Sequence, residues 1–81
     1  MINIEDKIIE IDNLNNKNIN EKKLSLENLL HEYNDKKNQN EKNQLLYLIH
    51  YIIHKYSELK YSYKFIIDYN KSNKKIAEFF S

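Results

Sequence analysis

An apolar repeat in the second half of the chain limits the possible folds more than any other feature. Its residues are separated alternately by four and three positions, which is the spacing of the a and d positions of a heptad. They are Leu45, Ile49, Ile52, Tyr56, Leu59, Tyr63 and Ile66. Three more residues, Leu46, Ile53 and Ile67, widen the stripe as a bundle helix requires. The pattern predicts a helix over residues 41–69, with Asn40 as its N-cap.

The length of that helix conflicts with the size of the chain. A helix over residues 41–69 is roughly 43 Å long at about 1.5 Å per residue. A globule of 81 residues has a diameter of about 30 Å. Either the helix breaks between Tyr56 and Ser62 and the protein is a monomer, or residues 56–69 protrude and form a homodimer. We favour the broken helix, although no Gly or Pro enforces a break.

Shorter amphipathic segments lie on both sides of this repeat. Asn3 is expected to cap a first helix, which ends in an Asn-rich loop at residues 13–18. Asn18 or Asn20 is expected to cap a second helix, which ends in a polar connector at residues 34–40. Ser72 is expected to cap a short last helix, whose apolar residues are Ile76, Phe79 and Phe80.

The sequence therefore predicts one all-α domain over residues 1–81, a small helical bundle of three longer helical segments plus a short C-terminal helix. The absence of Gly and Pro supports this fold, because tight β-hairpins lose their preferred turn residues. Helices joined by Asn-rich loops are least affected by the absence of Gly and Pro, because Asn tolerates the left-handed C-cap conformation. The predicted core consists of Ile4, Ile8, Ile11, Leu26, Leu29, Leu30, Leu45, Ile49, Ile52, Tyr56, Leu59, Tyr63 and Ile66.

Charge and composition argue against several classes of function. The formal net charge is +1, which is too balanced for a dedicated DNA-binding domain. The acidic N-terminus has no apolar signal region, and the apolar run at residues 45–53 is far shorter than the ~20 residues of a membrane span. We therefore expect a cytoplasmic protein without a transmembrane segment. The chain has no Cys, so it can form no disulfide or thiolate metal site.

Residues that could perform chemistry are few. We find no Gly-rich loop and no paired carboxylates in an apolar setting, and we expect no catalytic residues and no cofactor. His50 and His54 are four residues apart, so one turn of a helix could present both to a metal ion. No third ligand is evident from the spacing. We therefore interpret them as surface histidines and expect no metal site.

Tyrosines and lysines are concentrated in the second half of the chain. Exposed Tyr is enriched at binding surfaces, so this region is the candidate surface for a protein partner. The candidate residues are Tyr47, Tyr51, Lys55, Lys60, Tyr61, Lys64 and Tyr69. Alternatively, the Tyr and Lys content reflects the codons of an AT-rich genome. The same interleaving could also stack the bases of single-stranded nucleic acid, but the missing Arg and the low net charge argue against nucleic acid as a partner.

The run Tyr63-Lys64-Phe65-Ile66, followed by Lys71-Ser72-Asn73-Lys74-Lys75, resembles the late helix and basic tail of small Gram-positive bacteriocin immunity proteins of the lactococcin and pediocin type. This resemblance implies a cytoplasmic four-helix bundle that protects a bacteriocin producer at the membrane receptor attacked by the toxin. The sequence thus favours a non-enzymatic protein-binding module with an immunity-like role. The rival hypothesis is an inhibitor from a phage or mobile element, which blocks a host defence nuclease or complex in the manner of an anti-CRISPR protein.

Overall fold

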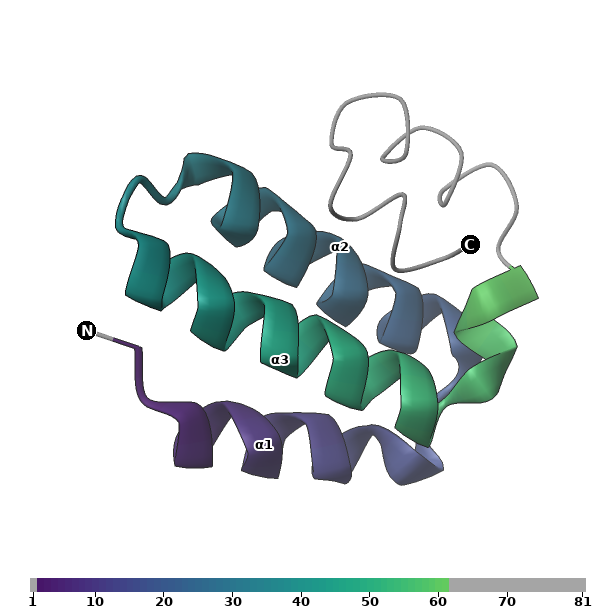
Figure 1. Cartoon of the computed structure of the whole chain (residues 1–81). Coiled ribbons are helices and arrows are strands. Elements are labelled where there is room, and N and C mark those ends of the chain that lie inside the picture. The colour runs from purple at the N-terminus through teal and green to yellow at the C-terminus, as the bar shows by residue number, and fades with distance from the viewer. Residues whose placement is uncertain (1, 62–81) are drawn as a thin grey trace.

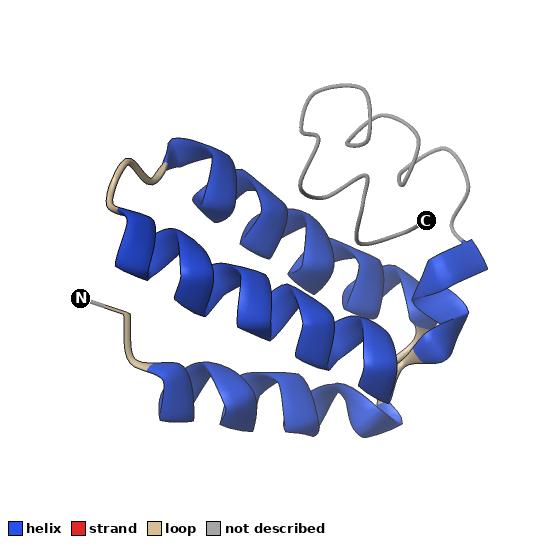
Figure 2. Cartoon of the chain, in the orientation of Figure 1, coloured by secondary structure: helices blue, strands red, loops and turns tan. Residues whose placement is uncertain are grey.

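Three α-helices, joined by short turns, make up the part of the chain that the computed structural model describes, residues 2–61. Helix α1 spans Ile4–Asp12, α2 spans Ile19–Asp35 and α3 spans Gln39–Lys55. Two 3₁₀ turns, η1 (Asn13–Asn16) and η2 (Ser57–Tyr61), follow α1 and α3. Helix α3 lies between α1 and α2 (Figure 1), and no strand occurs in residues 2–61 (Figure 2). The predicted all-α fold is confirmed, whereas the predicted helix with Ile76, Phe79 and Phe80 lies outside the described residues.

Each of the three helices begins with the same local device. An Asn side chain accepts a hydrogen bond from the backbone N–H three residues later, and that later residue is acidic, which suits the positive end of the helix dipole. The three pairs are Asn3 with Asp6 at 3.1 Å, Asn18 with Glu21 at 3.0 Å, and Asn38 with Glu41 at 3.1 Å. Asn3 is confirmed as the N-cap of α1. Of the two candidates for α2, Asn18 is the N-cap and Asn20 is not. The prediction of Asn40 is wrong, because Asn38 has the acidic residue at the required spacing.

The helix C-termini are built differently from the sequence-based expectation. No residue in 2–61 has a positive φ, so Asn supplies no left-handed cap there. At the end of α2, the Lys42 Nζ atom instead donates to the carbonyl oxygen of Tyr33 at 3.2 Å and lies 4.4 Å from the centre of its ring. The connector between α2 and α3 is also shorter than predicted, at residues 36–38. In the predicted first loop, residues 13–16 form the η1 turn.

The long predicted helix breaks at Tyr56, the first residue of the interval in which we expected a break. Helix α3 ends at Lys55, and Tyr56 leaves the helical conformation with φ −120° and ψ 75°. One continuous helix over residues 41–69 is therefore wrong. Because the chain turns here, the Tyr56 hydroxyl reaches α1, where it donates to the carbonyl oxygen of Ile11 at 2.6 Å. This contact thus stabilises a break that no Gly or Pro enforces.

The turn after α3 is fixed against α2 as well as α1. Leu59 is fully buried within it. The Nζ atom of Lys22, which is only 8% exposed, lies 2.8 Å from the Glu58 carboxylate and 4.6 Å from the centre of the Tyr56 ring. An ion pair and a cation–π contact thus satisfy this buried ammonium group. The apolar periodicity gave no sign of this buried charge.

The core lies where the three helices and η2 meet. Its predicted members that are buried are Ile11, Leu26, Leu29, Leu30, Leu45, Ile49, Ile52, Tyr56 and Leu59. Ile4 and Ile8 are only partly buried at the edge of the core, and Tyr63 and Ile66 lie outside the described residues. Tyr33, Leu48 and Ile53 are buried too; Ile53 belonged to the widened predicted stripe, whereas Leu48 did not. Because α1, α2 and η2 all pack on α3, the buried part of its surface is wider than the a and d positions of a heptad alone would give.

No helix within residues 2–61 is long and apolar enough to cross a lipid bilayer.

Candidate functional site

One side of α3 stays exposed although the helix lies between its neighbours. We call this surface the α3 face. Its residues recur every three or four positions and line two shallow, open, mostly apolar depressions. They are Asn43, Leu46, Tyr47, His50, Tyr51, His54 and Lys55. The face is thus an aromatic strip along the middle helix of the bundle.

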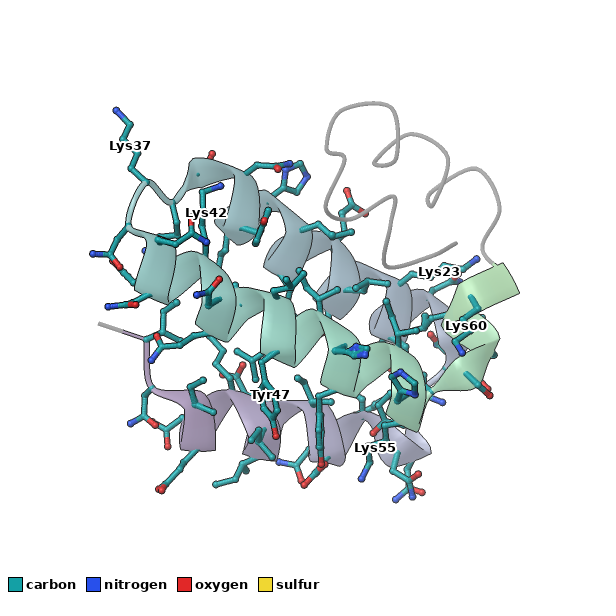
Figure 3. All side chains as sticks on the ribbon, viewed as in Figure 1. Lys23, Lys37, Lys42, Tyr47, Lys55 and Lys60 are labelled. Carbon is teal, nitrogen blue, oxygen red and sulfur yellow. The ribbon has the colours of Figure 1, made fainter. Side chains whose placement is uncertain are left out.

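Tyr47 is the most prominent apolar group on this strip. Its side chain is 54% exposed, and in Figure 3 it lies at the boundary between α3 and α1. Its ring centre is 6.5 Å from that of Tyr51, with the two planes tilted by 30°. Two other large apolar residues are as exposed, Ile9 on α1 and Leu24 on α2, but neither lines the α3 face. They therefore serve as matched controls for Tyr47.

Tyr51 and Lys55, two of the predicted partner-binding residues, both contact the end of α1. The Tyr51 hydroxyl donates to Asp12 Oδ1 at 2.6 Å, and Lys55 Nζ lies 2.9 Å from the same oxygen. Lys55 Nζ also lies 5.9 Å from the centre of the Tyr51 ring. Both side chains are therefore held in place on the α3 face. The Lys55 charge is partly balanced inside the chain, which reduces what it could offer to nucleic acid.

The position of Asp12 explains why it needs these two partners. Asp12 is the last residue of α1, where its negative charge meets the negative end of the helix dipole. Lys55 is the last residue of α3, where a positive charge is favourable. The hydrogen bond from Tyr51, and then Lys55, lower the pKa of the Asp12 carboxyl below its ordinary value. The same contacts with Asp12 raise the pKa values of Tyr51 and Lys55.

The lowered pKa of Asp12 predicts how this contact depends on pH. Because the folded-state pKa lies below the ordinary value of 3.8, the contact contributes its full stability above that value. The contribution is lost as the pH falls through the folded-state pKa. We expect Asp12→Asn to lower Tm at neutral pH, and we expect the Tm difference from the unchanged protein to shrink as the pH falls below 3.8. Thermal unfolding followed by circular dichroism from pH 7 to pH 2 measures both.

The control for this pH experiment is Glu10→Gln, which changes an exposed carboxyl of the same helix. A Tm difference for Asp12→Asn that stayed constant through the acid range would contradict the prediction, because it would show that ionisation of Asp12 does not stabilise the fold.

Two histidines occupy the middle of the strip, and the predicted site did not include them. The ring centres of His50 and His54 lie 4.5 Å apart, with 52° between the planes. Partial burial, and then the charges of His54 and Lys60, lower the pKa of His50. The signal was present in the sequence, because positions 47, 50, 51 and 54 have the spacing of one helix face. The predicted site was selected by residue type, so it included the tyrosines of this face and left out the histidines.

The remaining predicted site residues are not part of the strip. Lys60 is exposed on η2, at the same end of the molecule as Lys23 (Figure 3). Tyr61 ends η2, but its side chain is not described. Lys64 and Tyr69 lie outside the described residues, as does most of the proposed dimer segment. The structure thus brings together Tyr47, Tyr51 and Lys55 from the predicted set.

Another depression lies between α1 and α2. It is lined mainly by polar groups, and an ion pair between Lys7 Nζ and Glu32 Oε1, 3.1 Å long, joins the two helices there. Leu29 and Ile11 are its apolar lining. With opposite charges already paired, this groove is less suited than the α3 face to hold an aromatic or aliphatic group.

Residues 2–61 contain no group of three or more His, Asp or Glu side chains placed to hold a metal ion. Comparisons of the chain with protein-family models, with curated proteins and with solved structures found no match.

Proposed function

We propose that this protein is a non-enzymatic binding module that docks on another protein through the α3 face. The observation that carries the proposal is the exposed Tyr47 side chain at the centre of a strip of aromatic rings. Tyrosine offers a large contact area at a low cost in side-chain entropy, and it is enriched at protein interfaces. The opposite side of the same helix forms the core, so the strip has a rigid support.

The fixed side chains beside Tyr47 support the same proposal. Tyr51 is held by its hydrogen bond to Asp12, and Lys55 by the ion pair with the same carboxylate. Side chains that are ordered before binding lose less conformational entropy in the complex. A partner with an apolar group would match the exposed Tyr47 ring beside the ordered Tyr51 and Lys55 side chains.

Site-specific photo-crosslinking tests the proposed surface. A photoreactive phenylalanine analogue replaces Tyr47 in one variant and Leu24, which is 58% exposed on α2, in the other. Both variants are expressed in cells of the host that encodes the protein. We expect a discrete crosslinked protein from position 47 and none from position 24. Equal labelling from both positions, or crosslinks only from position 24, would rule out the α3 face as the docking surface.

The resemblance to bacteriocin immunity proteins makes the proposal more specific. If the module protects against a bacteriocin, a sensitive strain that expresses it survives the toxin, and Tyr47→Ala abolishes survival while Leu24→Ala preserves it. If the module inhibits a host defence complex, the same cells show relief of phage restriction and no protection from the toxin. Cells that show neither effect would exclude both of these roles, while the crosslinking experiment would still test for docking.

A further inference from the structure

The two histidines of the α3 face have a geometry that the aromatic strip alone does not require. They lie one helical turn apart, and their ring centres are separated by 4.5 Å. In a two-histidine chelate, a Zn–N bond of about 2.1 Å and a near-tetrahedral angle place the ring centres about 5 Å apart. The observed separation is therefore close to the separation that a shared metal ion imposes.

We propose that His50 and His54 form a two-histidine chelate for a divalent transition-metal ion of the borderline class, with Zn²⁺ as the ion to test first. Imidazole nitrogen is a preferred ligand of this class of ion. Both side chains are exposed, so water or a group from a bound partner fills the remaining coordination positions. The proposal goes beyond the docking function and does not depend on it.

The chemical surroundings both assist and limit this site. Imidazole binds a metal ion only through a ring nitrogen that carries no proton, so the affinity should fall as the pH is lowered. The positive charge of Lys60 acts on His50 and also repels a bound cation. The charge of Lys55 is countered by Asp12 at 2.9 Å. We therefore expect a site that binds in the micromolar range and not as tightly as a closed structural zinc site.

A bound ion would change the α3 face itself. It would lie beside Tyr47 and Tyr51, because all four side chains line the same depression. It would also link two successive turns near the C-terminal end of α3 and so stabilise the folded state by mass action. Metal binding thus has two independent readouts, the affinity for the ion and the thermal stability of the protein.

The test uses the full chain without a histidine tag, titrated with ZnCl₂ by isothermal titration calorimetry. We expect one ion per chain, and a loss of affinity of about tenfold or more in His50→Ala and in His54→Ala, because each removal abolishes intramolecular chelation. The matched control is His31→Ala, which removes an exposed histidine of α2 and is expected to leave the affinity unchanged. Zn²⁺ should also raise Tm in the unchanged protein and in the control, but not in the other two variants.

The proposal would be overturned if Zn²⁺ bound equally well to the unchanged protein and to both variants, since the ion would then be at other groups. It would also be overturned if affinity for Zn²⁺ were lost in only one of the two variants, because a chelate needs both rings. Circular dichroism of each variant without metal distinguishes loss of the site from loss of the fold.

Discussion

Replacing Leu48 by alanine is expected to lower the free energy of unfolding by about 2–5 kcal/mol, the range for a fully buried leucine. Leu48 has no exposed surface, because α3 is covered on several sides. A domain this small is stable by about 5 kcal/mol, near the low end for globular proteins. The variant should therefore keep a free energy of unfolding of at most about 3 kcal/mol, and with the largest loss in this range it lies at its unfolding midpoint at 25 °C. Urea unfolding followed by circular dichroism measures the change.

Leu46→Ala is the control for Leu48, since it removes the same atoms two residues earlier, on another side of α3. Leu46 is only partly buried and lines a depression of the α3 face, so we expect a loss of about 1 kcal/mol. The sequence pattern included Leu46 in the buried stripe and omitted Leu48. Equal losses for the two variants, or a larger loss for Leu46→Ala, would mean that α3 is rotated from the orientation described above.

Tyr56→Phe is expected to lower the free energy of unfolding by about 1–3 kcal/mol, although it removes a single oxygen atom. The Tyr56 hydroxyl donates to the carbonyl oxygen of Ile11 at 2.6 Å and to that of Asp12 at 3.3 Å. Both carbonyls belong to the last turn of α1, where backbone donors are scarce; the N–H of Asn13 serves the Ile11 carbonyl only together with that of Ile9. Without the hydroxyl, the buried Ile11 carbonyl has lost its short hydrogen bond. Urea unfolding of the two proteins gives the difference.

Tyr47→Phe provides the comparison for Tyr56→Phe, because it makes the same chemical change on a ring that is 54% exposed. We expect its effect to stay within about 0.5 kcal/mol. If Tyr56→Phe lowered the free energy of unfolding by no more than Tyr47→Phe, the hydrogen bond of the Tyr56 hydroxyl would not be what stabilises the break. A well-folded variant in which α3 continued beyond Lys55 would point to the hydroxyl as the cause of the break itself.

The amino-acid pattern was a good guide to the helices and a poorer guide to their ends. Apolar periodicity placed the three helices because each buries a stripe of its own residues, such as Leu26, Leu29 and Leu30 in α2. The same periodicity continued through Tyr56 and Leu59, which are buried in the structure although α3 has already ended. A residue can thus keep its place in an apolar pattern while the backbone changes direction.

The candidate site shows a similar division between local and distant causes. Tyr47, Tyr51 and Lys55 were predicted from their residue types and from the concentration of tyrosine and lysine in the second half of the chain. That Tyr51 and Lys55 would meet Asp12 could not be predicted, because Tyr51 lies 39 residues from Asp12 along the chain and Lys55 lies further still. The pairing of Lys22 with Glu58 escaped prediction for the same reason. Local spacing reports which residues share a face, and only the tertiary fold reports what that face touches.

The way the helices end has a consequence for how the molecule folds. The end of α1 is satisfied by Tyr56 and that of α2 by Lys42, both from other elements. Each of these contacts adds a long-range hydrogen bond to a helix end that local backbone groups complete only in part. The last turns of α1 and α2 should therefore reach their full stability only when the helices assemble. In this chain the beginning of each helix is fixed by its own Asn cap, whereas the ends of α1 and α2 depend on the whole fold.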